Sequence, residues 1–224
     1  MFVTVTFKSR ATRFAVDNPD DHIQAHHVRG EFYELPSLIT HSQLIPMHGT
    51  VLDIGANLGN HTLFYAQHTW AGRIYSFEPN PRARHLLARN IAANDGYRAV
   101  IDLEYAPLAI SSAKGRLKAV EPHPNNLGGT QFVPSEDGIE GARLDDLNFQ
   151  GHIAFIKIDV EGGELRVLAG GSSLIRQFRP VISVEIAERN ETEFWEWMRE
   201  NRYQVIGASY NYLHCKDYLI IPSY

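Results

Sequence analysis

The sequence predicts an α/β protein with a doubly wound, mainly parallel sheet that ends in a C-terminal antiparallel hairpin. Apolar runs alternate with helical segments about five times along the chain, which is the order of β-α units in a parallel sheet. The run 153–158 is apolar except for Lys157, as in a strand buried on both faces. The strands expected at 203–208 and 218–221 are close enough in sequence to form a hairpin.

Local patterns define the elements. In chain order, the expected strands are 2–7, 51–54, 72–77, 101–110, 153–158, 181–186, 203–208 and 218–221. The expected helices are 38–44, 60–68, 81–93, 165–178 with a break near 170–171, and one that begins after Asn190. Ser37 is the expected cap of the first helix. Asn80 precedes Pro81 at the start of the third, and Asn190 precedes Glu193 at capping-box spacing.

Composition argues against several classes of protein. The chain has 224 residues, and its net charge of −5 without a basic run argues against nucleic-acid binding. No apolar stretch approaches the ~20 residues that span a bilayer, so we expect no membrane partner. The single cysteine, Cys215, excludes an internal disulfide and fits a reducing compartment. We therefore expect a cytoplasmic location.

The length fits a single domain over residues 1–224. Residues 1–48 precede the first β-α unit and have the size of a lid or extension over a site. Residues 111–150 form an insertion with a loop rich in glycine and proline, and such insertions usually carry specificity. Three histidines lie within residues 22–27, but no acidic or cysteine partner follows at ligand spacing, so we expect no metal site.

A glycine turn, residues 55–59, joins the strand at 51–54 to a helix. Such a turn lets backbone N–H groups and a helix N-terminus approach a ligand closely. Asp53, at the strand end, adds a carboxylate at the rim of the turn. Asn57 stands where the dinucleotide fingerprint G-x-G-x-x-G has its second glycine, and asparagine tolerates a left-handed backbone there. The turn is therefore a candidate ligand loop that lacks this fingerprint.

A second carboxylate, Glu78, follows the next strand, 25 residues beyond Asp53. In open α/β sheets, an acid at this strand end holds ribose hydroxyls. Two strand–turn–helix units in tandem favour this role for Glu78. The same side chain could instead cap the helix that begins at Pro81.

A third acidic group follows the strand 153–158, where Asp159, Glu161 and Glu164 occupy six positions around two glycines. Their place at a strand end predicts that they contribute to the same site as Glu78. Glu161 and Glu164 could instead be acids at a helix N-terminus, which the helix macrodipole favours.

Three motifs together resemble the FkbM family of S-adenosylmethionine-dependent methyltransferases. They are Asp53–Gly59, Phe77–Pro81 and Ile156–Glu164, and Arg179-Pro180 and Glu185 follow them. Each motif is weak alone, but the order and spacing over about residues 30–190 are specific to the family. The resemblance implies the seven-stranded, Rossmann-like fold of class I methyltransferases and S-adenosyl-L-methionine as the cofactor.

The resemblance also implies which residues hold the cofactor. It implies that the glycine turn contacts the methionine portion, that Glu78 holds the ribose hydroxyls, and that residues around Ala109 and Ile110 lie near the adenine. The cofactor-binding residues expected on this basis are Asp53, Gly55, Ala56, Asn57, Gly59, Asn60, Glu78, Pro79, Ala109 and Asp159. Because the cofactor carries a sulfonium and an ammonium group but no phosphate, acidic surroundings and the missing glycine both fit it.

The chemistry of methyl transfer suggests the catalytic residues. The nucleophile, methyl group and sulfur must be held in line, and a hydroxyl acceptor must also lose a proton to a base. Asp159 and Glu161 are the candidate bases, and the loop residue His123 is a third. Lys157 could orient the acceptor oxygen, and Asn126 could contact the cofactor or the acceptor.

We therefore expect an enzyme that O-methylates a hydroxyl of a small molecule or sugar. We expect no nucleic acid as a partner, and a homodimer could complete the pocket. Two alternatives remain. One is a methyltransferase fold that binds ligands without catalysis. The other is a nicotinamide-dependent oxidoreductase, against which the missing G-x-G-x-x-G and the lack of a Tyr-Lys or His pair count.

Overall fold

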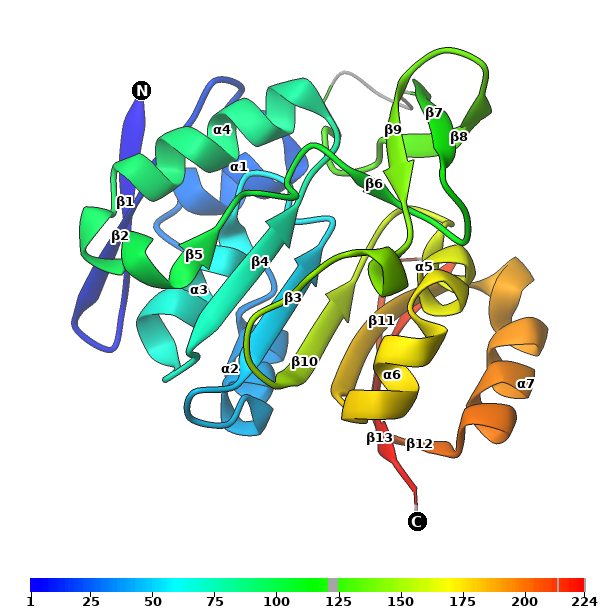
Figure 1. Cartoon of the computed structure of the whole chain (residues 1–224). Coiled ribbons are helices and arrows are strands. Elements are labelled where there is room, and N and C mark those ends of the chain that lie inside the picture. The colour runs from blue at the N-terminus through cyan, green and yellow to red at the C-terminus, as the bar shows by residue number, and fades with distance from the viewer. Residues whose placement is uncertain (121–124, 213, 224) are drawn as a thin grey trace.

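The structure is a computed structural model that describes residues 1–120, 125–212 and 214–223. Its centre is a seven-stranded sheet in the order β12-β13-β11-β10-β3-β4-β5 (Figure 1). The strands are β3 (Thr50–Ile54), β4 (Arg73–Phe77), β5 (Ile101–Asp102), β10 (Ile153–Ile158), β11 (Val181–Ala187), β12 (Tyr203–Tyr212) and β13 (Cys215–Pro222). β13 runs antiparallel to both of its neighbours, and the other pairs are parallel. The predicted sheet with its C-terminal hairpin is confirmed.

Helices cover both faces of this sheet. They are α1 (His22–Val28), α2 (Leu35–Leu44), α3 (Asn60–His68), α4 (Pro81–Ala92), α5 (Glu164–Gly170), α6 (Ser172–Phe178) and α7 (Glu191–Asn201). Successive strand residues point to opposite faces. Val51 and Phe155 therefore pack with α2, α3 and α4, while their neighbours Leu52 and Ile156 pack with α5, α6 and α7. No helix of the described residues is long and apolar enough to cross a membrane.

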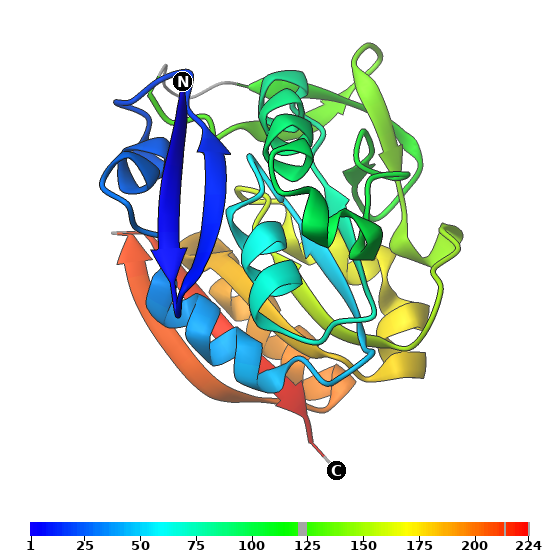
Figure 2. The same ribbon diagram turned by 90° about the vertical axis from the view of Figure 1, so that its left-hand side faces the viewer.

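The N-terminal segment begins with a hairpin of β1 (Phe2–Phe7) and β2 (Arg10–Ala15), which lies beside α1 and α2 (Figure 2). The sequence predicts the first strand but not the second, because Arg10 and Arg13 obscure its apolar alternation. Phe14 and Ala15 are nevertheless fully buried and anchor the hairpin to the core. Asp21 caps α1 by accepting hydrogen bonds from the backbone N–H groups that follow it.

The start of α2 corrects a prediction. The helix begins at Leu35 instead of residue 38, and Ser37 lies inside it and does not cap it. Glu34 occupies the N-cap in the left-handed region, with φ of 55°. Pro36 fits the first turn, where a missing N–H costs nothing, and so allows the earlier start.

The segment 101–110 is not one strand, as the sequence predicts, but two short ones. β5 ends at Asp102, and β6 (Ala109–Ile110) belongs to a second sheet. Pro107, which has no backbone N–H, lies between them and cannot take part in a continuous ladder. The second sheet has the order β6-β9-β7-β8, with β7 (Gly115–Val120), β8 (Gln131–Ser135) and β9 (Ile139–Ala142).

Two details of the helices test the predicted boundaries. The break near 170–171 is confirmed, since α5 ends at Gly170, where an added β-carbon would lie 2.1 Å from the carbonyl oxygen of Ser111. Asn190 precedes α7 as predicted, but its side chain makes no capping hydrogen bond. A short 3₁₀ turn, Glu188–Asn190, leads into the helix, so Asn190 has a nearly helical backbone and does not form the capping box.

Candidate active site

A row of polar residues crosses the centre of the sheet. Ser183, Lys157, Asp53 and Ser76 are register partners on four adjacent strands, β11, β10, β3 and β4. Thr62 of α3 lies over this row and donates a hydrogen bond of 2.5 Å to Asp53. Its hydroxyl is also 2.8 Å from that of Ser76. The row places charged groups inside an otherwise apolar core, directly beneath the glycine turn.

Lys157 ties the glycine turn to the end of β10. Its Nζ donates a hydrogen bond of 2.9 Å to the carbonyl oxygen of Gly55, and it lies 3.1 Å from Asp159 and 3.8 Å from Asp53. Burial alone would lower the pKa of this ammonium, but Asp159 and Asp53 outweigh burial and raise it. Lys157 is therefore a permanent cation whose donors already face protein acceptors.

The glycine turn approaches Asp159 too closely for a side chain at its first position. A β-carbon on Gly55 would lie 1.7 Å from the carbonyl oxygen of Asp159, and Gly55 has φ of 82°. Asn57 also adopts the left-handed region, with φ of 49°, as its place in the turn predicts. The side-chain oxygen of Asn57 is buried and has no hydrogen-bond partner among the described residues.

Glu78 holds the far side of the turn. One carboxylate oxygen accepts a hydrogen bond of 2.8 Å from the backbone N–H of Asn57, and the other accepts one of 2.8 Å from that of Asn80. Burial raises the pKa of Glu78 to about 7, although both hydrogen bonds act to lower it. Asn80, not Glu78, caps α4, because its side chain accepts from the N–H groups of Arg82 and Ala83.

A cavity of about 240 Å³ opens beside the glycine turn, and we call it the turn cavity. Its walls come from the turn, the ends of β4 and β10, the N-terminal segment and the insertion. The lining residues are His22, Ile23, Tyr33, Glu34, Gly55, Ala56, Asn57, Asn60, His61, Glu78, Pro79, Asn126, Leu127, Gly128, Thr130, Phe132, Lys157, Asp159, Val160, Glu161, Glu185 and Cys215.

A second cavity of about 240 Å³ lies between α2 and the β12–β13 hairpin, and we call it the hairpin cavity. The lining residues are Glu34, Pro36, Ser37, Thr40, His41, His61, Lys157, Ile158, Asp159, Ser183, Glu185, Gly207, Ala208, Ser209, Asp217, Tyr218 and Leu219. The two cavities share Glu34, His61, Lys157, Asp159 and Glu185. They are therefore neighbouring chambers on either side of one polar wall.

Carboxylates crowd this wall. One oxygen each from Asp159, Glu161 and Glu185 lies within 4.8 Å of the others, which is close enough for a shared cation. Burial, together with the charges of Asp159 and Glu164, raises the pKa of Glu161 to about 8. Burial and the charges of Asp159 and Glu161 raise the pKa of Glu185 to about 10. The acids thus face one another with Lys157 as the only lysine or arginine among the described residues of the wall.

The structure brings most of the predicted site residues together. Nine of them line the turn cavity, namely Gly55, Ala56, Asn57, Asn60, Glu78, Pro79, Lys157, Asp159 and Glu161. Ala109 lines a small adjoining cavity of about 30 Å³, whose wall also includes Gly55 and Pro79. Asn126 also lines the turn cavity, whereas His123 lies outside the described residues.

Three predicted residues occupy supporting positions. Asp53 is fully buried behind the turn and lines neither chamber. Gly59 is the N-cap of α3 and lies against Leu87, and it lines neither chamber. Glu164 is buried at the start of α5, where it accepts a hydrogen bond of 2.7 Å from the backbone N–H of Gly162. The structure therefore favours the helix-terminus interpretation of Glu164.

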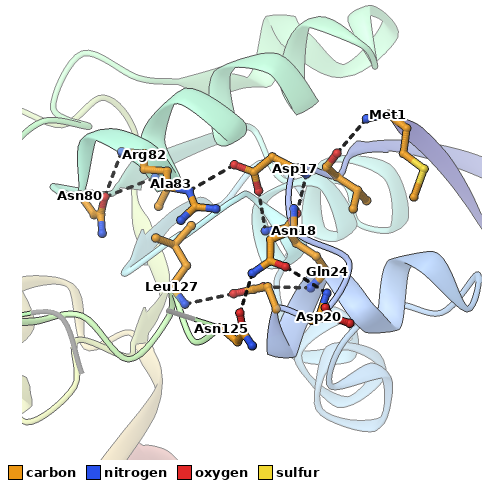
Figure 3. Close-up of polar contacts among 12 residues, drawn as sticks. Met1, Asp17, Asn18, Asp20, Gln24, Asn80, Arg82, Ala83, Asn125 and Leu127 are labelled. Atoms are coloured by element: carbon orange, nitrogen blue, oxygen red, sulfur yellow. Dashed lines mark hydrogen bonds and ion pairs between the residues drawn. The ribbon is translucent and has the colours of Figure 1, made fainter. Parts of the chain in front are cut away.

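The N-terminal segment is fastened to the insertion beside the turn cavity (Figure 3). Asp21 accepts a hydrogen bond of 3.0 Å from the backbone N–H of Leu127. The side-chain amides of Asn18 and Asn125 make another of 3.0 Å. The described part of the insertion lines the turn cavity and not the hairpin cavity. Residues of the N-terminal segment line both cavities, and the role of the insertion in specificity stays a prediction.

Sequence reasoning missed several residues of the wall. Glu34 reaches both chambers from the N-terminal segment, and its left-handed backbone was the one signal of a special role, visible only in the structure. His61 lies 3.5 Å from Glu34, and burial lowers its pKa well below the usual value, so it is a neutral imidazole. Asp217 joins the hairpin cavity because β13 pairs with β11.

The reversed strand in a seven-stranded sheet, the glycine turn and the acid at the next strand end define a class I methyltransferase. The chain belongs to the family of the methyltransferase FkbM domain, whose model matches residues 53–205. The family resemblance of the three motifs is thereby confirmed, and the protein is a methyltransferase.

Individual relatives agree with this assignment. Hexuronic acid methyltransferase AglP of Haloferax volcanii is 30% identical over 181 residues, which cover 79% of this chain and 70% of the relative. The 2-O-methyltransferase NoeI of Sinorhizobium fredii is 28% identical over 189 residues, covering 71% of this chain and 72% of the relative. The crystal structure of methyltransferase FkbM from Methylobacillus flagellatus shares the fold, with a TM-score of 0.56 and 18% identity. The match covers 80% of this chain and 45% of that one.

Proposed function

We propose that the protein transfers a methyl group from S-adenosyl-L-methionine to a hydroxyl group of a sugar or a similar small molecule. The observation that carries this proposal is the pair of chambers joined by one polar wall. The turn cavity is lined by residues to which the family resemblance assigns donor binding, and the hairpin cavity offers room for an acceptor directly beside it. The names of the relatives AglP and NoeI support a sugar-like acceptor.

The residues of the turn cavity fit this donor. The unpartnered side-chain oxygen of Asn57 can accept a hydrogen bond from a ligand, and Glu78 retains acceptor capacity for ribose hydroxyls. Ala109 and Pro79 border the small adjoining cavity, which suits the edge of an adenine ring. Asp159 and Glu161 supply negative charge toward a cationic ligand. When bound, the donor supplies an activated methyl group on a positively charged sulfur.

Asp159 is the general base in this proposal. The base must reach the acceptor oxygen, and Asp159 lines both chambers whereas Glu161 lines only the turn cavity. The acceptor oxygen forms its new bond to the methyl carbon as the carbon–sulfur bond breaks, and its proton passes to the Asp159 carboxylate. Lys157 acts as a positioning residue, since its ammonium holds Asp159 at 3.1 Å and the turn at 2.9 Å.

A transfer assay tests the proposal. The protein is incubated with labelled S-adenosylmethionine and a panel of sugars and other hydroxyl compounds, and labelled product is measured. We expect transfer to at least one sugar, and we expect Asp159→Asn to lower the rate at saturating donor by about 10²–10⁴-fold. Asp137→Asn, at an exposed position in the β8–β9 turn, is the control and should transfer normally.

The two alternatives predict different results. Donor binding without transfer to any hydroxyl compound would support a binding module instead of an enzyme. Binding of NADH in place of S-adenosylmethionine would overturn the choice of cofactor. Transfer to an amine or a carboxylate, but to no hydroxyl, would overturn the choice of acceptor group.

A further inference from the structure

The described lining of the hairpin cavity contains more acidic than basic residues. The carboxylate residues of its described lining are Glu34, Asp159, Glu185 and Asp217. The one lysine or arginine in the described lining, Lys157, is compensated by Asp159 and by Asp53 beneath the wall. The histidines of this lining add no positive charge, because burial lowers the pKa of His41 to about 4 and that of His61 well below its usual value.

Two of these acids are placed directly against each other. Glu185 on β11 and Asp217 on β13 are register partners in an antiparallel pair. Side chains opposite each other on such strands are about 5 Å apart at Cβ, and like charges there are unfavourable. Burial raises the pKa of Asp217 to about 7, and the charge of Glu34 acts in the same direction. Lys157 lies on β10, on the far side of β11 from Asp217, and opposite Ser183 in the sheet register.

Buried polar side chains without partners point to a polar ligand in the same cavity. Ser183 is 8% exposed, and its hydroxyl has no hydrogen bond among the described residues. His41 is 6% exposed, and its Nδ1 bonds the hydroxyl of Tyr65 at 2.8 Å, while its Nε2 has no partner among the described residues. Buried polar groups in proteins are nearly always satisfied, so these two are available to the hydroxyls of a ligand.

From the cavity, the paired acids and the unsatisfied polar groups together, we propose that the acceptor is a hydroxyl compound that carries a protonated amine, such as an amino sugar. Its ammonium group lies between Glu185 and Asp217, and the hydroxyl that is methylated lies at Asp159. Ser183 and His41 bind further hydroxyls. This inference rests on the proposed function and specifies the acceptor for it.

The same acids disfavour an acceptor that carries a carboxylate. A carboxylate in this cavity would meet Glu185 and Asp217 without a free cation among the described lining residues. An ammonium group supplies the missing positive charge and favours ionised Glu185 and Asp217, whereas a carboxylate would raise their pKa values further, so the two acids discriminate between these ligands. The inferred acceptor of this chain therefore differs in charge from that of its relative AglP, whose name gives hexuronic acid as the substrate.

A charge series of matched sugars tests the inference. The probes are the methyl glycosides of glucosamine, glucose and glucuronic acid, and the corresponding galactose series. Each is titrated by calorimetry into full-length protein saturated with S-adenosylhomocysteine. Within any series that binds, we expect the amine to bind about tenfold more tightly than the neutral sugar, and the uronate to bind more weakly than either.

Variants of Glu185 and Asp217 test whether these two acids cause the preference for the amine over the neutral sugar. Asp217→Asn is expected to lower the ratio of amine to neutral affinity about fivefold or more, and Glu185→Gln to do the same. Affinity for S-adenosylhomocysteine serves as the folding control, and for Asp217→Asn it should stay within about twofold because Asp217 does not line the turn cavity. Glu196→Gln, on the exposed side of α7, is the matched control and should change neither affinity.

The outcomes separate this inference from the proposed function. Equal binding of amine and neutral sugars, tighter binding of the uronate, or an unchanged ratio in Asp217→Asn would overturn the inference and leave the proposed function standing. Binding of S-adenosylhomocysteine with no affinity for any sugar would overturn the sugar acceptor and this inference together. Failure to bind S-adenosylhomocysteine would contradict the proposed cofactor itself.

Discussion

Glu78 accepts a hydrogen bond of 2.8 Å from the backbone N–H of Asn57, so the end of β4 fixes the shape of the glycine turn. Its second oxygen accepts an equally short bond from the N–H of Asn80. Both bonds leave lone pairs free on the carboxylate. Glu78 can therefore hold the turn and a ligand in the turn cavity at the same time.

Removing this carboxylate should weaken donor binding. We expect Glu78→Ala to lower the affinity for S-adenosylhomocysteine about 30-fold, or ~2 kcal/mol, because the N–H of Asn57 also loses its acceptor. Glu78→Gln keeps one carbonyl oxygen and should lose less. Calorimetric titration measures both, with the exposed Glu104→Ala as the control. An affinity for Glu78→Ala within twofold of the wild type would contradict a role in binding.

Removing the buried ammonium should destabilise the fold. Lys157→Met leaves Asp53, which is 0% exposed, without its countercharge. We expect a loss of about 3–5 kcal/mol in the free energy of unfolding, measured by denaturant titration. The double variant Lys157→Met/Asp53→Asn should recover part of it, because the uncompensated charge is gone.

An exposed ion pair provides the matched control for Lys157. Lys114 lies 3.6 Å from Asp146, and its side chain is 74% exposed. Lys114→Met should therefore change stability by less than about 1 kcal/mol. Equal effects of the two lysine substitutions would show that burial of Lys157 has no energetic importance.

Alanine at the start of the glycine turn should not be tolerated. Gly55→Ala places a β-carbon 1.7 Å from the carbonyl oxygen of Asp159 at a residue with φ of 82°. We expect a loss of at least ~3 kcal/mol in stability, followed by circular dichroism during thermal unfolding. Gly115→Ala, whose β-carbon would meet nothing within 4 Å, should stay within about 0.5 kcal/mol of the wild type. A stable Gly55→Ala protein would contradict the close approach of the turn to β10.

The acids of the wall should make the protein less stable as the pH rises. The pKa of Glu161 is about 8 in the folded protein, against an ordinary value of 4.5. Because the pKa is higher in the folded state, the folded protein binds the proton of Glu161 more tightly than the unfolded chain does. The contribution of this proton to the free energy of unfolding is fully present below about pH 4.5 and is lost as the pH rises through about 8. Unfolding in denaturant at a series of pH values measures the decline.

Glu161→Gln should flatten this pH dependence. The variant has no proton to lose at this position. Between about pH 5 and 8, its free energy of unfolding should therefore decrease less than that of the wild type. The difference should be on the order of 1–2 kcal/mol, a range that allows for the partial exposure of the group. Glu185 and Asp217, whose pKa values are also raised, remain to titrate in it. Glu136→Gln, at an exposed position, is the control. Identical pH profiles for Glu161→Gln and the wild type would contradict the raised pKa.

The sequence predicts the features that depend on neighbours in the chain. Asn80 caps α4, Asn57 adopts a left-handed backbone, and Gly170 ends α5, and in each case the type of residue at that position is the signal in the sequence. The mainly parallel sheet follows from the alternation of β and α elements, and the hairpin follows from the short loop between the last two strands. These local signals were sufficient for the sheet and for most of the turn cavity.

The features that depend on strand register were not predictable in this way. Asp53 is an acid at a strand end by sequence, but its pairing with Lys157, 104 residues later, places it under the turn and not at its rim. Glu185 faces Asp217 only because β13 inserts antiparallel beside β11. Glu34 enters the wall from a segment whose sequence has no recognisable motif. The hairpin cavity is therefore a product of tertiary pairing alone.

The shared wall has a thermodynamic consequence. Because five residues, among them Asp159 and Glu185, border both chambers, a charge bound in one chamber acts on the ligand in the other. Such coupling is reciprocal, so whatever the donor does to acceptor affinity, the acceptor does equally to donor affinity. In the proposed reaction the cationic sulfonium becomes a neutral thioether while the acceptor's proton passes to Asp159, so one positive charge moves from the donor to the wall. The chemical step itself thus resets how tightly each chamber holds its occupant.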